Sequence, residues 1–226
     1  MNPANPLQLH HINAERLCAF VCRQLANFFP DDDPIRADQL APHIGAALER
    51  INACFSNIQK SKFRSDEGAF FNYLHPDHYA MFLYLLANTV FVSSRNERIA
   101  FRLYYLNKAL HALDAFYDIT LPETFQFMHP TGTVLGHASY GNYFCVYQNC
   151  TVGSDEEGNF PTLGEGVILY AGARVIGQSR IGNNVVLGTN ALVLGRDIPD
   201  NKVVISGDSR SRLTENRRHV LERRFR

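Results

Sequence analysis

The chain has 226 residues, of which 46% are hydrophobic, and its 22 basic and 22 acidic residues give a formal net charge of zero. This composition is typical of a globular protein of one large or two small domains and excludes a disordered or fibrous chain. The balanced charge gives no reason to expect nucleic acid or an anionic membrane as a partner. No apolar run approaches the roughly 20 residues of a membrane span, and the start lacks a signal pattern, so we expect no membrane span and a cytoplasmic location.

The first helices are predicted from apolar residues spaced three and four apart. This spacing runs from Leu17 to Phe28, and Asn13 stands before it as the expected N-cap. The acids and proline of Asp31–Pro34 predict the start of the next helical segments, which we expect to run to about Gln59 with an interruption near Pro42.

Two longer helices are expected after these. Residues 77–91 are apolar on nearly all sides, which predicts a buried helix. Asn96 is the expected N-cap of a further helical segment, which we expect to run through Tyr117 and to end before Pro122.

Glycine usage changes sharply after this region, because 13 of the 15 glycines lie between Gly132 and Gly207. Neither a helical period nor a period of two fits this part, whereas a period of six does. The apolar series, with one interruption, is Val134, Tyr140, Val146, Val152, Leu163, Leu169, Val175, Ile181, Leu187 and Val193. Such hexads predict a three-sided parallel β-helix, in which one residue per side points inward and glycines allow positive φ at the corners.

Two segments fall outside the hexads. Residues 154–161 break the phase and are expected to leave the prism as a loop, where sites often gather. The tail from Ser209 holds seven arginines, with Thr214 as a candidate helix cap. Because no aromatic stacking platform accompanies these arginines, we expect the tail to be solvated or to contact a subunit rather than nucleic acid.

Three stretches of this chain resemble the serine acetyltransferase branch of the hexapeptide acyltransferases. Residues 103–116 are similar to the last helix of that family. Residues 129–136 read H-P-T-G-T-V-L-G, similar to H-A-T-G-x-V-V-G, and residues 148–153 read Q-N-C-T-V-G, similar to Q-x-V-T-L-G. The resemblance covers about residues 96–207. It implies an α+β protein with a helical domain (1–126), a left-handed parallel β-helix (127–205) and a basic, partly helical tail (206–226).

The resemblance also implies an acetyl-CoA-dependent O-acetyltransferase that acts on a small hydroxylated acceptor, without a metal. Its histidine base aligns with His129, while a second alignment makes His137 the base, and both histidines can instead be structural. The pair His75 and His78 could suggest a metal, but no third ligand at convincing spacing is visible. A non-catalytic hexapeptide scaffold and a zinc hydrolyase remain as alternatives.

The remaining site residues are also implied by the resemblance. Acetyl-CoA is expected between neighbouring prisms of a homotrimer or a dimer of trimers. The residues expected to contact acetyl-CoA are Gly153, Ala171, Thr189, Arg210 and Arg212. The residues expected to contact the acceptor are Asp155, Glu156 and Glu157.

The chain departs from the family at positions that bear on the acceptor. Met128 replaces the aspartate before the histidine, and Asn159-Phe160-Pro161 replaces R-H-P. Ser93-Ser94-Arg95 stands where the family has a helical D-P. These losses leave a sugar hydroxyl at least as plausible an acceptor as serine, so both acceptors stay open.

Overall fold

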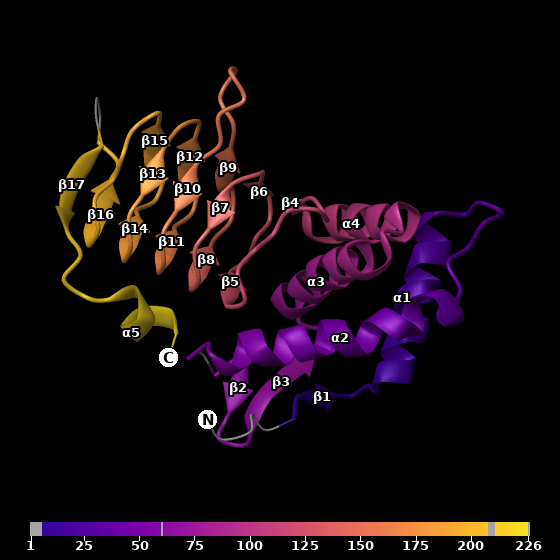
Figure 1. Ribbon diagram of the computed structural model, residues 1–226. Helices are drawn as coiled ribbons and strands as arrows, with labels where there is room; N and C mark the ends of the chain where they lie inside the picture. Colours follow the sequence, from indigo (N-terminus) through magenta and orange to yellow (C-terminus); the bar gives the residue numbers. More distant parts are fainter. Residues whose placement is uncertain (1–5, 60, 208–210, 226) are drawn as a thin grey trace.

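The computed structural model describes residues 6–59, 61–207 and 211–225 and joins a helical part to a β-prism (Figure 1). The helices are α1 (Ala14–Phe28), α2 (Ala37–Ser56), α3 (Pro76–Ser94), α4 (Glu97–His111) and α5 (Val220–Arg224). A small sheet beside the helices has the order β1 (Gln8–His10), β3 (Gly68–Asn72) and β2 (Arg64–Ser65). No helix in the described ranges is long and apolar enough to cross a membrane, and all five cysteines are free thiols.

Both predicted N-caps are confirmed. The Asn13 side chain accepts a hydrogen bond from the backbone N–H of Arg16 at 2.8 Å, and that of Asn96 accepts from Ile99 at 3.2 Å. Each bond satisfies a backbone donor that has no partner within its own helix. The end of α4 was predicted too late, because Ala112 takes a left-handed conformation (φ 50°) and the chain then enters the prism.

The start of α2 differs from the prediction. The helix begins at Ala37, and its ladder continues through Pro42 without an interruption. The acids that suggested an earlier start instead form ion pairs with α4, Asp31 with Arg102 and Asp33 with Arg98, both at 2.6 Å. Pro42 is exposed, and the opposite face of α2 is buried in the core, so packing holds the helix despite the lost hydrogen bond.

The helix α3 is buried on nearly all sides, as its sequence predicts. Every residue from Asp77 to Val90 is buried, because the helix packs against α2, α4 and the prism strand β5 (Phe125–Phe127). Tyr84 and Asn88 of this helix form hydrogen bonds with residues 117–119 at the start of the prism. The Tyr84 hydroxyl donates to the Ile119 carbonyl at 2.6 Å, and the Asn88 amide donates to the Tyr117 carbonyl at 2.8 Å. The helical part is therefore fixed to the prism by buried hydrogen bonds as well as by apolar packing.

The prism has three faces of parallel strands, so the predicted parallel β-helix is confirmed. One face contains, in spatial order, β4 (Asp114–Ala115), β6 (Val134–Leu135), β9 (Thr151–Gly153), β12 (Arg174–Ile176) and β15 (Leu192–Leu194). The second contains β5 (Phe125–Phe127), β8 (Phe144–Val146), β11 (Val167–Leu169), β14 (Val185–Leu187), β16 (Lys202–Ile205) and, antiparallel at its end, β17 (Arg212–Glu215). The third contains β7 (Ser139–Tyr140), β10 (Thr162–Leu163) and β13 (Arg180–Ile181).

Nine of the ten hexad positions point into the prism, and Val134 does not. Val134 is 40% exposed, whereas its neighbour Leu135 is 1% exposed and pairs with Val152 of the next coil. The chain reaches the next inward position, Tyr140, one residue sooner than a regular hexad would. The hexad phase is therefore correct from Tyr140 onward and wrong by one residue at the first coil.

Glycines have two different roles in the prism. Those that follow an inward residue allow the coils to approach closely, since a Cβ on Gly141 would lie 2.4 Å from the carbonyl carbon of Gly164. Positive φ occurs at other glycines, such as Gly166 (φ 66°), and also at asparagines, such as Asn190 (φ 58°). The expectation that corner glycines supply positive φ thus holds for one set of glycines, while asparagine supplies it at several corners.

The basic tail folds back onto the protein. It first forms β17 against β16, so Thr214 lies in a strand and is not a helix cap; His219 caps α5 instead. Phe225 is fully buried and forms an isolated bridge with Ile58, close to the end of α2. The tail therefore ties the last coils of the prism to the helical part, which Figure 1 shows as the yellow segment approaching α2.

Candidate active site

The corner before strands β6, β9, β12 and β15 forms one long edge of the prism, which we call the His129 edge. Successive coils are joined there by backbone hydrogen bonds of 2.9 Å, from Asn149 to the Thr131 carbonyl and from Asn190 to the Ala171 carbonyl. His129 lies two residues before Thr131, and Thr189 directly precedes Asn190. The structure therefore brings His129, Ala171 and Thr189 to the same edge.

Arg212 lies at the far end of this edge. It opposes Ile205 in the antiparallel pair of β16 and β17, and the carbonyl of the preceding Val204 accepts a 2.8 Å hydrogen bond from Gly188. The Arg212 side chain is exposed and lies beside the coil that carries Thr189. Arg210, the other arginine expected to contact acetyl-CoA, falls outside the described residues.

The opposite ends of the same strands form a second edge, which we call the loop edge. Gly153 ends β9 there, and its carbonyl accepts a 3.0 Å hydrogen bond from Gly177 of the next coil. His137 follows β6 at the same edge. Because a three-residue strand spans about 10 Å, the structure does not bring Gly153 next to Ala171 and Thr189.

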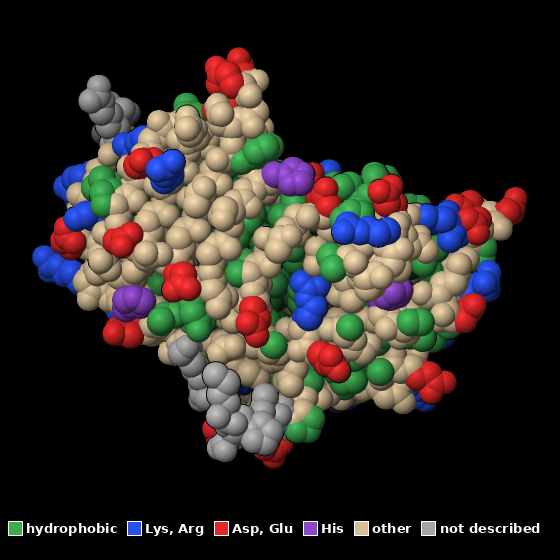
Figure 2. Space-filling model, viewed as in Figure 1, with side chains coloured by type: hydrophobic (Ala, Val, Ile, Leu, Met, Phe, Trp, Pro, Cys, Tyr) green, Lys and Arg blue, Asp and Glu red, His purple; other side chains and the backbone are tan. Residues whose placement is uncertain are grey.

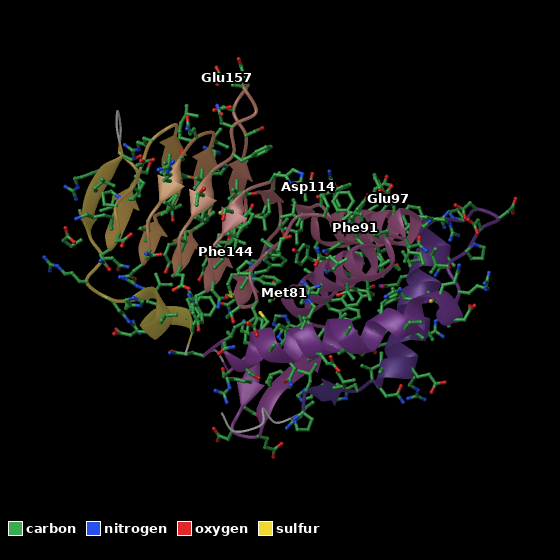
Figure 3. All side chains as sticks on the ribbon, viewed as in Figure 1. Met81, Phe91, Glu97, Asp114, Phe144 and Glu157 are labelled. Carbon is green, nitrogen blue, oxygen red and sulfur yellow. The ribbon has the colours of Figure 1, made fainter. Side chains whose placement is uncertain are left out.

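Residues 154–161 leave the prism at the loop edge, as predicted. Asp155 shapes this loop: its carboxylate accepts hydrogen bonds from the side chain and backbone of Asn159, at 3.0 and 2.9 Å, and these bonds lower the pKa of Asp155. Glu156 and Glu157 are exposed, and Figure 2 shows acidic side chains gathered at the loop tip. Glu157 projects away from the prism (Figure 3), so in one chain the acidic residues do not approach His129.

The loop also walls a shallow depression on the outside of the prism. Its volume is about 510 Å³, and it is lined by Ser154 to Glu157 together with Ile176 and Leu194. Three of its lining residues are acidic and two are apolar. It lies at the loop edge and does not include His129.

His129 is held by a residue of the helical part. Its side chain is 63% exposed, and its backbone has a left-handed conformation with φ of 51°. The backbone N–H of His129 donates to Asp77 Oδ1 at 3.1 Å, while its Nδ1 lies 3.9 Å from Asp77 Oδ2. The carboxylate of Asp77 thus fixes the unusual backbone and faces one ring nitrogen, which leaves Nε2 on the far side of the ring.

Sequence reasoning missed Asp77. It lies in the first turn of α3, where the helix dipole stabilises a carboxylate, and it is only 4% exposed. Among the described residues no lysine or arginine lies within ion-pair distance of it. An acid at the start of an otherwise apolar helix is unusual and could have drawn attention to Asp77. Nothing in the sequence, however, linked it to a histidine 52 residues away.

The neighbouring histidines of α3 have structural positions. His78 is fully buried, and its Nδ1 accepts a 3.2 Å hydrogen bond from the Asn72 backbone. The ring of His75 stacks on it with centroids 4.4 Å apart. Burial lowers the pKa of His78 to about 3, so it is neutral at physiological pH. In the part of the chain that the structure describes, no group of three His, Cys, Asp or Glu side chains has the geometry of a metal site.

His137, the alternative base, has its own carboxylate on the loop edge. Its Nε2 lies 3.8 Å from Asp118 Oδ1, and its ring meets Phe160 edge-on with centroids 5.7 Å apart. The side chain is 58% exposed. The two candidate histidines therefore lie at opposite ends of β6 and cannot act on the same bond within one chain.

Comparison with known proteins finds serine acetyltransferases, by sequence over part of the chain and by fold over most of it. No family model matches the chain. An 81-residue stretch is 35% identical to the serine acetyltransferase of Synechococcus elongatus, and it covers 34% of this chain and 33% of that protein. The matched stretch thus spans about a third of the curated relative.

Solved structures extend the likeness over most of the chain. Serine acetyltransferase from Neisseria gonorrhoeae has a TM-score of 0.68 at 19% identity, with 94% of this chain and 83% of that chain covered. The Brucella abortus enzyme in complex with coenzyme A gives 0.63 at 16% identity, covering 91% and 83%. Isoform 3 from Entamoeba histolytica, in complex with cysteine, gives 0.58 at 22% identity, covering 88% and 73%.

These comparisons define the class of protein by its fold. The chain has the serine acetyltransferase fold, a helical part followed by a left-handed parallel β-helix, and a third of it shares sequence with one such enzyme. The resemblance predicted from the sequence is confirmed at this level.

Proposed function

We propose that the protein is an acetyl-CoA-dependent O-acetyltransferase that acts on a hydroxyl of a small acceptor. The observation that carries this proposal is the exposed imidazole of His129, which stands at the start of an edge lined by Ala171 and Thr189. Asp77 binds the backbone N–H of His129, and its carboxylate lies 3.9 Å from the ring Nδ1. The fold supports the same activity, because its structural neighbours are serine acetyltransferases, one of them in complex with coenzyme A.

In this mechanism Nε2 of His129 takes the proton of the acceptor hydroxyl. The oxygen attacks the thioester carbonyl, and the tetrahedral intermediate collapses as the carbon–sulfur bond breaks. The imidazolium then returns the proton to the departing CoA thiolate, so that an ester and free CoA are formed. Asp77 is the positioning residue: its negative charge stabilises the imidazolium and orients the ring through Nδ1, a role for which Met128 offers no group.

We propose that acetyl-CoA lies along the His129 edge. Ala171 is small and half-buried, and Thr189 is exposed, so both leave room for an extended thioester arm beside the backbone. The exposed guanidinium of Arg212 stands at the far end, where it can pair with a phosphate. Gly153 lies on the loop edge, so it can contact only an acetyl-CoA molecule that is bound to a neighbouring prism.

This arrangement favours a homotrimer or a dimer of trimers. Asp155, Glu156 and Glu157 lie on the loop edge, about one strand length from the His129 edge of their own chain. If they contact the acceptor, the loop of one subunit must meet the His129 edge of another. An intersubunit site also fits the exposed position of His129 on the surface of a single chain, where its side chain is 63% exposed.

Two acceptors are supported by different observations. Serine is favoured by a structural neighbour solved in complex with serine. A sugar hydroxyl is favoured by Phe160, which is 50% exposed in the loop and offers an apolar platform within the stretch that replaces the R-H-P of the family. Because acetyl-CoA and five free thiols fit a reducing compartment, we place the reaction in the cytoplasm.

The test is an acceptor screen read as release of free CoA thiol from acetyl-CoA. The panel contains serine, nucleotide sugars and oligosaccharides, with buffer alone as the blank. We expect acceptor-dependent thiol release with at least one member and loss of that release in His129→Ala. Binding of acetyl-CoA without turnover on any acceptor would instead support the non-catalytic scaffold.

A further inference from the structure

A second cavity lies between the helical part and the segment that leads into the prism. Its volume is about 430 Å³, and it is bounded by α2, by α3 and by residues 121–123. Its walls include Glu49, Arg50 and Ala53 of α2, Leu85 of α3, and Leu121 and Glu123. None of these residues belongs to the His129 edge or to the loop edge, so the cavity is separate from the proposed active site.

Arg50 is one of the residues that line this cavity, and its guanidinium bonds to α3 through one nitrogen. Its Nη1 donates to the Leu85 carbonyl at 3.3 Å and to Thr89 Oγ1 at 2.9 Å. Among the described residues, its Nε and Nη2 have no hydrogen-bond partner, and neither atom is buried away from solvent. The two bonds through Nη1 hold the group rigidly, so the free Nε–H and Nη2–H form the planar fork that binds a carboxylate with two parallel hydrogen bonds.

The charge of Arg50 is unpaired in the described part of the chain. No carboxylate there lies within ion-pair distance of it, and burial lowers the pKa of its guanidinium. A half-buried guanidinium without an anion is costly unless a ligand supplies one. The cavity therefore favours a ligand with a carboxylate.

The acidic residues at the rim of the cavity favour a ligand that also carries a positive charge. Glu49 and Glu123 are exposed on it, so the three charged residues sum to a formal charge of minus one. A multiply charged anion such as phosphate is disfavoured there, whereas an ammonium group beside the glutamates is favoured. The rest of the wall is apolar, with Leu85 and Leu121 buried and Ala53 beside them.

We propose that this cavity binds an α-amino acid with an apolar side chain. The carboxylate lies on the Nε and Nη2 fork of Arg50, and the ammonium lies near Glu49 and Glu123. The side chain packs on Leu85 and Leu121. A bound ligand would bridge α2 to residues 121–123, which Tyr84 also holds through a 3.0 Å hydrogen bond from the Leu121 backbone N–H.

The test is calorimetric titration and thermal unfolding of the full chain, in which variants of the cavity residues separate binding here from binding at the proposed active site. Leucine is the probe. Isovalerate lacks the ammonium, isoamylamine lacks the carboxylate, and aspartate carries a charged side chain. We expect leucine to bind and to raise the melting temperature, and the three other compounds to bind at least about tenfold more weakly.

Three variants decide where leucine binds. Arg50→Lys keeps the charge but loses the fork, so the Kd for leucine should rise at least about tenfold. Glu123→Gln changes an exposed residue, which keeps the test valid if Arg50→Lys fails to fold, and it should weaken leucine but not isovalerate. Arg36→Gln alters an exposed arginine at the start of α2 and should change nothing. Failure of leucine to bind, or an unchanged Kd for leucine in both Arg50→Lys and Glu123→Gln, would overturn the proposal.

Discussion

The prism and the helical part hold their residues in place by different kinds of contact. In the prism each inward side chain stacks on its equivalent in the next coil, as Leu163 does on Ile181, so one short repeat predicts many contacts. In the helical part the decisive contacts join residues far apart in sequence, such as Cys54 and Phe125, whose Sγ and carbonyl oxygen lie 3.0 Å apart. The periodic region can therefore be predicted position by position, and the helical region only element by element.

The largest effect is expected from a charge placed inside the prism. Ile181 is 3% exposed and lies between Leu163 and Ile198 of the adjacent coils. Ile181→Asp buries an unpaired carboxylate and should lower the free energy of unfolding by several kcal/mol. Thermal unfolding followed by circular dichroism measures the change.

Val134→Asp is the matched control, because the hexad pattern alone treats both positions alike. Since Val134 is 40% exposed, its replacement should cost no more than about 1 kcal/mol, including the repulsion from Asp114 on the neighbouring strand. Equal damage in the two variants would mean that Val134, and not Leu135, points inward in the first coil.

The tail provides the next test, because it links the two regions. Phe225 is fully buried, and its ring centroid lies 5.5 Å from that of Tyr143. Phe225→Ala should cost about 3 kcal/mol, as for other large-to-small core substitutions. Arg217→Ala, on the exposed side of the same tail, should have little effect. An unchanged denaturation midpoint in Phe225→Ala would show that the tail does not pack in solution.

A smaller effect is expected on the pH dependence of stability, and it comes from His78 in the helical part. The folded pKa of His78 is about 3 against about 6.5 when unfolded, so below pH 6.5 the unfolded chain binds more protons. Stability from this group is complete above pH 6.5 and falls by about 2 kcal/mol between pH 7 and pH 5. His78→Phe should flatten that slope in urea titrations, whereas His43→Gln, near the surface, should not. A slope unaltered by His78→Phe would contradict the buried, neutral assignment.

The sequence could predict the site only as far as the repeat extends. His129, Ala171 and Thr189 could be chosen because their coil positions follow from hexad phase and family motif, and they do share an edge. The repeat does not say which end of a strand a residue occupies once a loop intervenes, so Gly153 was grouped with them although it lies on the loop edge. Asp77 could not be predicted at all, because its contact with His129 depends on how α3 docks on the prism.

The same limit explains the errors in the helical part. The caps at Asn13 and Asn96 depend on local hydrogen bonds and were predicted correctly. The acids near residue 31 satisfy the local rule for a helix start, but distant arginines of α4 bind them. Local rules thus fail where a tertiary partner competes for the same side chain.

The assignment of His129, positioned by Asp77, as the catalytic base is tested most directly by kcat in His129→Ala, Asp77→Asn and His137→Ala, with the acceptor found in the screen. We expect His129→Ala to lower kcat by about 10²–10⁴ and Asp77→Asn by at least about tenfold, while the affinity for CoA barely changes in either. His137→Ala should retain near-normal kcat. Full activity in His129→Ala together with loss of activity in His137→Ala would rule out His129 as the base and move the base to the loop edge.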